Sequence, residues 1–515
     1  MHDPLPTPRE MSLWDKKTIK EFGILPEILM ENASREALNF LKNRFGSLKD
    51  KSALVFAGSG NNGGDAFALA RHLANHEVTV MVLYAKKKES YGKTSAYHLS
   101  LLEKMGVTLM YLPDYNLDFL KHVDIIVDGL LGTGFNGSLR PEFRAWIKSI
   151  NKLKSRSYIF SLDIPSGING VTGEPSDTAV RADATVTFEE PKLGLALPPA
   201  NDYVGHLHVG KIGIPRKIKQ DHPPTHFALT AKIMHLIQRP QKTMHKGDAG
   251  HVVVFGGSPG LTGAPMLSAL GAVRSGAGLT TIACPGRLAS EVKAGWPDIM
   301  ILPAGDTDSW EENAAGIIPD AVSRADAVVF GPGLGRGESS RQALIAYLRE
   351  MHPKTVFDAD ALYFFANDHS LFEYVKDKTD VIFTPHPGEM ARFFGVSSVD
   401  INMDRAGYAQ KFINEFQSKL ILKGAGTIVA APRHPFFISP FAVPNLALGG
   451  AGDVLAGMTG SLMARGYSSL QAASIAVYWH GLTGNILQKK YPYRGNTAQE
   501  IAHTLPKTLA EAKDA

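Results

Sequence analysis

A short run of small residues near the carboxyl end of the chain, Gly449-Gly450-Ala451-Gly452, leads directly into the acid Asp453. Apolar residues recur at helical spacing from Val454 to Met463, so we expect the run to form a turn at the start of a helix. Backbone amides in such a turn, together with the helix dipole, favour a bound anion such as a phosphate group. Asp453 is therefore either a helix cap or a catalytic carboxylate that faces a phosphate, and the spacing alone leaves both open.

A second cluster of polar and small residues, Asn61 to Asp65, follows a short apolar stretch. It offers carboxamides, bare amides and one acid at a helix start, which suits a nucleotide ribose or phosphate, a monovalent cation, or an ordinary turn with a capping Asp. Two other apolar stretches also end in acids, Asp128 and Asp163, and Ser166 follows the latter closely. Hard oxygen ligands from Asn62, Asp128 and Ser166 suit a hard cation.

The elements that must position these residues alternate between strands and helices. In the first half we expect helical structure over 12–42, a helix that opens at Ala66, and strands at 52–57, 78–83, 124–128 and 158–163. Unbroken apolar strands that alternate with helices indicate a mostly parallel sheet covered on both faces. Ligands bind beyond the carboxyl ends of such strands, so the three polar strand ends predict one shared site.

The second half repeats this alternation. We expect a strand at 251–255, a helix at 263–275, strands ending at Cys284, near Leu302 and at Phe330, Phe357 and Phe383, a last strand pair from Lys419, and two helices after the Asp453 motif. Prolines among scattered charges at 211–246 predict a linker. The sequence therefore predicts an α/β protein with two domains, residues 1–222 and 223–515.

The composition excludes several other classes of protein. The 515 residues are 44% hydrophobic and 20% charged, and the net charge of +4 is too small and too dispersed to indicate a nucleic-acid partner. The single Cys284 excludes an intramolecular disulfide framework and a multi-thiolate metal site, and we expect it to lie buried in a strand. We expect no membrane partner, because no apolar run reaches about 18 residues, and no leader sequence, because Met1 to Pro6 lacks a charged-then-apolar pattern. A cytoplasmic enzyme fits these observations.

Four blocks of the first half together resemble the NAD(P)H-hydrate epimerase domain: Met30–Ala33, Gly60–Asp65, Gly132–Gly134 and Asp163–Gly167. The resemblance spans roughly residues 5–220 and implies a Rossmann-like three-layer αβα fold with K⁺ held by Asn62, Asp128 and Ser166. It further implies that the hydrate is contacted by Asn61, Asn62, Gly63, Gly64, Asp65, Gly132, Thr133, Gly134, Phe135, Asn136, Gly137, Ser138 and Asp163. The reaction is inversion at C6 of a hydrated nicotinamide, and Asp163 is our candidate for the acid/base group. Ala66 stands where the family usually has glycine, and we expect its methyl group to tighten the pocket mouth.

The second half resembles the NAD(P)H-hydrate dehydratase family, a branch of the ribokinase-like αβα fold. Eight blocks carry the resemblance: Lys246–Gly250, Gly256–Ser258, Thr262–Pro265, Gly331–Gly335, Asp358–Leu362, Thr384–Glu389, Lys423–Thr427 and Gly450–Asp453. The resemblance implies nucleotide contacts from Lys423, Gly424, Ala425, Gly426, Thr427 and Gly452, and hydrate contacts from Ala264, Gly335, His386 and Asp453. It also implies ADP as the phosphoryl donor, together with Mg²⁺.

The chemistry implied for this half is phosphoryl transfer to the ring hydroxyl, which turns a poor leaving group into a good one. The amides of Gly449 to Gly452 would form the anion hole, and Asp453 would accept the hydroxyl proton. We expect the helix N-terminus to lower the pKa of Asp453. We also expect the two flanking prolines to hold His386 in place.

The two resemblances together predict a bifunctional repair enzyme, which we expect to form a homo-oligomer. It would epimerise the R and S forms of NADHX and NADPHX, and dehydrate the S form with ADP to give NAD(P)H, AMP and phosphate. One alternative is a ribokinase-like small-molecule alcohol kinase with a non-catalytic N-terminal ligand-binding domain, which leaves the block from His386 to Glu389 unexplained. Another alternative makes the first half a scaffolding module, but the acids Asp65, Asp128 and Asp163 are all present.

Overall fold

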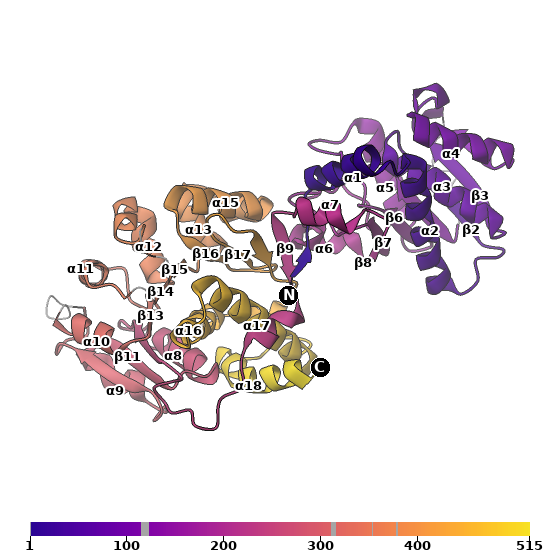
Figure 1. Cartoon of the computed structure of the whole chain (residues 1–515). Coiled ribbons are helices and arrows are strands. Elements are labelled where there is room, and N and C mark those ends of the chain that lie inside the picture. The colour runs from indigo at the N-terminus through magenta and orange to yellow at the C-terminus, as the bar shows by residue number, and fades with distance from the viewer. Residues whose placement is uncertain are drawn as a thin grey trace. The chain divides into compact units, whose positions relative to one another are not determined.

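The computed structural model describes residues 2–114, 123–310, 316–352, 354–376, 378 and 380–514 of the chain. The chain forms two compact units (Figure 1): the first is Pro4–His226, and the second is Phe227–Ala515 together with Met1–Asp3. The first residues belong to the second unit because β1 (His2–Pro4) joins its sheet beside β9 (His226–Leu229). Within the described ranges, we find no helix whose length and hydropathy would let it span a bilayer.

The first unit is a parallel sheet with helices on both faces. Its strands are β2 (Ser52–Ala57), β3 (Thr79–Tyr84), β4 (Thr108–Tyr111), β5 (Ile125–Gly129), β6 (Tyr158–Leu162), β7 (Ala184–Phe188) and β8 (His206–Gly210). Its helices are α1 (Pro8–Phe22), α2 (Pro26–Phe45), α3 (Asn61–Asn75), α4 (Lys93–Lys104), α5 (Pro141–Lys152), α6 (Asn201–Val204) and α7 (Arg216–Asp221). The strand order is β4-β3-β2-β5-β6-β7-β8, and every neighbouring pair is parallel. This is the predicted Rossmann-like arrangement. The order in which the chain adds strands reverses between β2 and β5, and such sheets bind ligands at this switch point.

Side chains along these strands alternate between two buried faces. Val55 and Val127 belong to one apolar cluster with residues of α1, α2 and α3, whereas Leu54 and Ile126 belong to another with residues of α5. Burial on both faces explains why the strands are unbroken apolar runs in the sequence.

Two helix boundaries differ from the prediction. The stretch 12–42 forms two helices, because Gly23 adopts a left-handed conformation (φ 69°) that ends α1, and Pro26 begins α2. The helix after β2 begins at Asn61 instead of Ala66. The cluster from Asn61 to Asp65 therefore forms the first turns of α3 rather than a loop before it.

The second unit is built around an 11-stranded sheet with the order β1-β9-β18-β17-β16-β15-β14-β13-β10-β11-β12. Its remaining strands are β10 (His251–Phe255), β11 (Leu279–Pro285), β12 (Met300–Ala304), β13 (Ala327–Phe330), β14 (Lys354–Phe357), β15 (Asp380–Phe383), β16 (Lys419–Leu422), β17 (Ile428–Ala430) and β18 (Phe436–Ile438). Its helices are α8 (Gly263–Arg274), α9 (Ala289–Lys293), α10 (Ile318–Arg324), α11 (Glu338–Arg349), α12 (Asp360–Asn367), α13 (Pro387–Phe394), α14 (Ser398–Met403), α15 (Arg405–Phe416), α16 (Ala451–Ala464), α17 (Ser469–Lys490) and α18 (Ala498–Asp514). The strands from β12 to β16 are all parallel. The order in which the chain adds strands reverses between β10 and β13, so the second unit has the same kind of topological switch point, where such sheets bind ligands.

The segment 211–246, predicted to be a linker, contains ordered elements. The helix α7, the strand β9 and a short 3-10 helix (Ala231–Leu236) lie within it. Ile233 and Met234 are buried in the core of the second unit. The prediction of a linker is therefore wrong for most of this segment.

The two faces of the second sheet have different cores. Val254 of β10 packs in an aliphatic cluster with α8, α16 and α17, whereas the next residue, Phe255, lies among aromatic rings. In that aromatic cluster the rings of Phe330 and Tyr347 lie 4.7 Å apart. Figure 1 shows α12, α13 and α15 on one side of the strands, and α16 and α17 on the other. Cys284 is buried in β11, as predicted.

Candidate active sites

In the first unit the loops after β2 and β5 meet at the point where the strand order reverses. The Gly58 amide donates to the Gly129 carbonyl at 2.9 Å, and a Cβ atom on Gly58 would lie 1.8 Å from the Leu130 carbonyl oxygen. A Cβ atom on Gly63 would lie 1.9 Å from the Gly58 carbonyl oxygen. Only glycine permits these approaches, which bring the start of α3, including Asn62, against the end of β5.

Asn62, Asp128 and Ser166 meet in a buried cluster. The Ser166 hydroxyl and amide donate to the two carboxylate oxygens of Asp128, at 2.5 and 2.8 Å. The Asn62 amide group donates to the carbonyl oxygens of Leu131 and Leu162 at 2.7 and 3.0 Å. Burial raises the pKa of Asp128, although its hydrogen bonds oppose the rise.

This cluster has the donor set of a cation site. Asn62 Oδ1 is buried and has no hydrogen-bond partner among the described residues. The Nδ2 atom of the same side chain donates to the Leu131 carbonyl, which the Ser166 hydroxyl also contacts, and Ser166 binds the buried Asp128 carboxylate, so the cluster contains a set of hard oxygen ligands. The described ranges contain no group of three or more His, Cys, Asp or Glu side chains that could hold a metal ion, so a cation here would depend on mixed oxygen ligands. The residues present fit a monovalent cation.

Asp163 is held by a lysine that the sequence analysis did not single out. Lys192 follows β7, its side chain is 2% exposed, and its ammonium group donates to Asp163 Oδ1. The same group donates to the Thr187 hydroxyl and to the Phe188 carbonyl, each at 3.0 Å. Asp163 has φ 60°, a strained conformation that is common at functional sites. The available signal was a lone lysine in the otherwise apolar run 191–197, directly after two acids.

Two further carboxyl groups surround the pair of Asp163 and Lys192. Burial raises the pKa of Asp65 well above its usual value, and the charges of Asp163 and Asp15 add to the rise. Burial also raises the pKa of Asp15, on α1, to about 6. One ammonium group cannot neutralise three carboxylates, so the protonated form of Asp65 is favoured and can donate a hydrogen bond or a proton.

The other residues predicted to contact the hydrate line the loop after β5 and the start of α3. A Cβ atom on Gly132 would lie 3.1 Å from Asn62 Cβ, so this glycine borders the cluster. The loop 133–138 is partly to fully exposed. Ala66 is fully buried against Gly129, so the expectation that its methyl group tightens a pocket mouth is wrong.

In the second unit the loops after β10 and β13 meet at the point where the strand order reverses. The Gly257 amide donates to the Pro332 carbonyl at 3.1 Å, and a Cβ atom on Gly256 would lie 2.1 Å from the same oxygen. Gly335 has φ 82° and donates its amide to Asp360 at 3.0 Å. Ala264, at the start of α8, borders the same loop, because a Cβ atom on Gly333 would lie 3.2 Å from Ala264 Cβ.

A buried charge cluster occupies the carboxyl ends of β14 and β16. Lys423 Nζ donates to Asp358 Oδ1 at 2.6 Å and lies 3.8 Å from Glu389 Oε2. A Cβ atom on Gly452 would lie 3.1 Å from the same Nζ atom, so the lysine reaches the first turn of α16. Gly450 has φ 87° and caps that helix, which confirms the predicted turn and places Asp453 in the first turn.

The pKa of Asp453 does not follow the prediction. Burial raises it to about 8, and the charge of Asp358 adds more than the charge of Lys423 removes. Burial likewise raises the pKa of Glu389 to about 7. The expected lowering by the helix dipole is therefore outweighed, because three acids share one lysine in a place shielded from water.

His386 is fixed by hydrogen bonds in addition to its two flanking prolines. It is the N-cap of α13, and its Nδ1 atom accepts from the amides of Gly388 at 2.9 Å and Glu389 at 3.4 Å. Burial lowers its pKa, as does the nearby Lys423. Because Nδ1 is an acceptor, the proton of the neutral ring lies on Nε2, on a side chain that is 56% exposed and can donate to a ligand.

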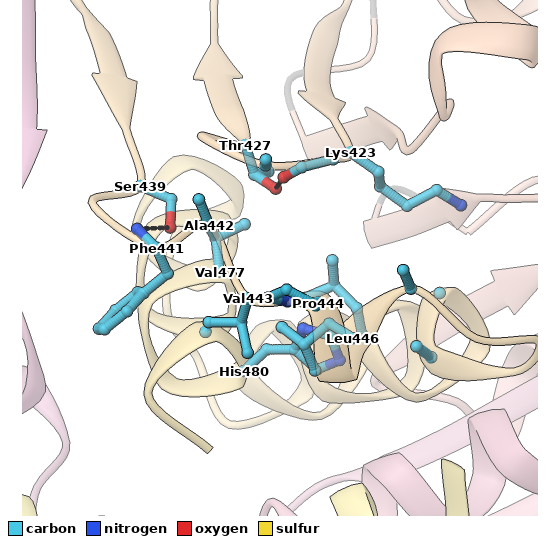
Figure 2. A pocket seen from close by; sticks show the side chains of 17 residues that line it. Lys423, Thr427, Ser439, Phe441, Ala442, Val443, Pro444, Leu446, Val477 and His480 are labelled. Atoms are coloured by element: carbon cyan, nitrogen blue, oxygen red, sulfur yellow. Dashed lines mark hydrogen bonds between the residues drawn. The ribbon is translucent and has the colours of Figure 1, made fainter. Parts of the chain in front are cut away.

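A cavity of about 370 Å³ lies beside the charge cluster (Figure 2). The predicted nucleotide contacts Lys423, Gly424, Ala425, Thr427 and Gly452 line it. Gly426 is not part of the lining, and its amide donates to the Phe441 carbonyl at 3.0 Å. The cavity is charged at the lysine and mainly apolar elsewhere, which suits a ligand with an anionic part and a flat apolar part.

The fold and the two sets of strand-end loops define a two-domain α/β enzyme whose second domain places Asp453 in the first turn of a glycine-capped helix. The second unit has the ribokinase-like fold: a ribokinase-like superfamily protein from Enterococcus faecalis matches 56% of this chain and 96% of its own, with a TM-score of 0.50 and 24% identity. The family model described as NAD(P)H-hydrate dehydratase matches residues 252–507, and the model described as YjeF-related protein N-terminus matches residues 26–194.

Relatives match the whole chain. The bifunctional NAD(P)H-hydrate repair enzyme of Dictyoglomus turgidum is 34% identical over 98% of this chain and 98% of its own, and that of Moorella thermoacetica is 33% identical over 99% and 97%. An ADP/ATP-dependent NAD(P)H-hydrate dehydratase from Bacillus subtilis, co-crystallised with ATP/Mg²⁺, is 27% identical, covers 55% of this chain and 97% of its own, and has a TM-score of 0.47. The chain belongs to the family of bifunctional NAD(P)H-hydrate repair enzymes. This membership confirms the predicted pairing of an epimerase domain with a dehydratase domain, and it disfavours the alcohol kinase.

Proposed function

We propose that the second unit transfers the β-phosphoryl group of ADP to the hydroxyl of the S hydrate and then eliminates phosphate, giving NAD(P)H and AMP. The observation that carries this proposal is the position of Asp453 in the first turn of α16, next to Gly452 and the Lys423 ammonium group. The helix amides and Lys423 favour the charge of the moving phosphoryl group, and ionised Asp453 accepts the hydroxyl proton. Mg²⁺ would arrive with the phosphates of the nucleotide.

In this proposal the exposed side of His386 and the loops at Ala264 and Gly335 receive the hydrated nicotinamide. His386 presents Nε2–H as a donor, and the Gly335 loop is held by its hydrogen bond to Asp360. The nucleotide lies in the cavity lined by Lys423, Gly424, Ala425, Thr427 and Gly452. We assign this reaction to residues 223–515.

We assign epimerisation at C6 to residues 1–222, with Asp163 as the acid/base group. Its support is the buried Lys192, which orients the carboxylate of Asp163 and balances its charge. The hydrate would be contacted by Asn61 to Asp65 and by residues 132–138. Asn62, Asp128 and Ser166 would hold K⁺, which would neutralise the buried carboxylate and fix the strand ends; the orphaned Asn62 Oδ1 supports this role.

A mixture of R and S hydrates with ADP and Mg²⁺ tests both activities in one experiment. Full conversion to NADH or NADPH is expected, because the first site converts R to S as the second consumes S. A stop at the initial S fraction would contradict the epimerase assignment, and absence of any conversion would contradict the dehydratase assignment. We also propose that the protein acts in the cytoplasm as a homo-oligomer. The single buried thiol fits a reducing compartment, and light scattering of the purified chain tests the oligomer.

A further inference from the structure

One polar atom in the cavity of the second unit has no partner. His480, on α17, is 8% exposed, and its Nε2 atom is buried without a hydrogen bond among the described residues. Its ring lines the cavity, and Figure 2 shows its side chain on the opposite side from Lys423 and Thr427, near Val443 and Leu446. A buried polar atom without a hydrogen bond is unfavourable, so we expect a group of a bound ligand to form a hydrogen bond with it.

The chemistry of this atom is defined by its surroundings. The Ala451 carbonyl accepts a hydrogen bond from the His480 ring, which leaves Nε2 with a lone pair and no proton. Burial lowers the pKa of His480 to about 4, and the Lys423 charge acts in the same direction, so the ring is neutral. A neutral ring with this tautomer can accept a hydrogen bond at Nε2 but cannot donate one there.

The other residues that line the cavity indicate which ligand group would face His480. Besides Lys423 and His480, the polar side chains of the lining are Thr427 and Ser439. Both are engaged within their own loops: the Thr427 hydroxyl donates to the Gly424 carbonyl at 2.7 Å, and the Ser439 hydroxyl accepts from the Phe441 amide at 3.3 Å. The walls near His480 are apolar, formed by Val443, Leu446 and Val477. The cavity therefore offers a slot for a flat ring, with one hydrogen-bond acceptor at its far end.

We propose that His480 is a specificity-determining residue that accepts a hydrogen bond, through Nε2, from the exocyclic amino group of the adenine ring of the nucleotide. This inference rests on the proposed use of the cavity for ADP. Lys423 and Gly452 bind the phosphate end, whereas His480 distinguishes the base at the other end. A base that lacks the amino group leaves Nε2 unsatisfied and binds more weakly.

The test compares ADP with purine riboside 5′-diphosphate, which differs by loss of the amino group alone, by calorimetry in the presence of Mg²⁺. The wild-type chain is expected to bind ADP about tenfold more tightly than the analogue. His480→Leu removes the acceptor and is expected to bind both nucleotides equally, whereas His480→Gln, which keeps an acceptor, retains part of the preference. His434→Leu, an exposed histidine of the same unit, is the matched control and keeps the full preference.

The outcomes separate this inference from the proposed function. If the wild-type chain binds neither nucleotide, the cavity is not a nucleotide site and the proposed function fails with it. If the wild-type chain prefers ADP and His480→Leu keeps the same preference, only the role of His480 is overturned. Should His480→Leu not fold, ¹⁵N spectra of histidine-labelled wild-type protein decide the question. Nε2 of His480 is expected to shift with ADP and not with the analogue, and equal shifts with both would contradict the proposal.

Discussion

Lys423 Nζ donates to Asp358 at 2.6 Å, and the two residues follow β16 and β14, the parallel strands on either side of β15. Asp358 is 1% exposed, so its charge depends on this lysine. Asp358 and Glu389 together raise the pKa of Lys423 despite its burial, which keeps a full positive charge at the start of α16. The pair therefore holds the charged ammonium group of Lys423 beside the helix start at which we propose that the phosphoryl group binds.

Asp358→Asn is expected to destabilise the second unit by about 3–5 kcal/mol, because it leaves the buried Lys423 with less compensation. Calorimetric melting of the full chain measures the effect. Asp320→Asn is the matched control, since Asp320 pairs with Arg324 on the exposed surface, where an ion pair contributes about 0–1 kcal/mol. Equal shifts of the melting midpoint for both variants would show that the buried pair has no special role.

The rate of dehydration is expected to rise with pH. The pKa of Asp453 is raised to about 8, and only its ionised form can accept a proton, so kcat/KM should increase up to that pH and level off above it. Glu389→Gln removes a charge that contributes to the rise, so the same profile should move to lower pH. Asp453→Ala should abolish dehydration and leave epimerisation intact. A profile that falls between pH 6 and 8 would contradict the role of Asp453 as base.

Lys192→Met is expected to slow epimerisation at least about tenfold, because Asp163 loses the ammonium group that orients it. The rate is measured well below the melting midpoint, so that unfolding does not contribute. Lys154→Met, which breaks a half-exposed pair with Asp183, is the control and should leave the rate unchanged. Asp163→Asn should lose activity and should also lower the melting midpoint, because it leaves the buried Lys192 with less compensation. An Asp163→Asn variant with the wild-type rate would show that another group carries the proton.

The cluster of Asn62, Asp128 and Ser166 predicts stabilisation by K⁺. A ligand that binds only the folded state raises the melting midpoint as its concentration rises. The midpoint is therefore expected to be higher in potassium chloride than in choline chloride at equal ionic strength. Asn62→Ala should remove the difference, and Asn75→Ala, at the exposed end of the same helix, should keep it. A midpoint that does not respond to K⁺ would contradict the proposed cation site at Asn62.

Strands were the most predictable part of this fold. The strands 52–57 and 251–255 have the predicted bounds, because an apolar run between turn residues has few alternatives in a doubly wound sheet. The meeting of Asn62, Asp128 and Ser166 also followed from strand ends alone, since parallel strands bring their carboxyl ends to one edge. Helix starts were harder, because Gly63 and Gly64 resemble a loop in sequence, whereas in the structure Gly63 packs against the Gly58 backbone and Gly64 against the side chains of Met30 and Ser95.

Pairings distant in sequence could not be predicted. The contact of Lys192 with Asp163 depends on the approach of β7 to β6, and a lysine in an apolar run gives no indication of its partner. The pKa of Asp453 depends on how many acids share Lys423, which only the folded arrangement reveals. The sequence likewise predicted the helix that carries His480 but not its orientation, so the unpartnered Nε2 atom could not be foreseen.

Ala66 gives the last prediction, because structure and sequence disagree about it. Its methyl group packs against the backbone of Gly129 inside the core and does not border a ligand pocket. Ala66→Gly therefore removes buried apolar surface and lowers helix propensity, which together should destabilise the first unit by about 1–2 kcal/mol. The KM for the R hydrate should stay unchanged, and calorimetric melting together with epimerase kinetics checks both expectations. A lower KM with an unchanged melting midpoint would instead place the methyl group at the mouth of the site.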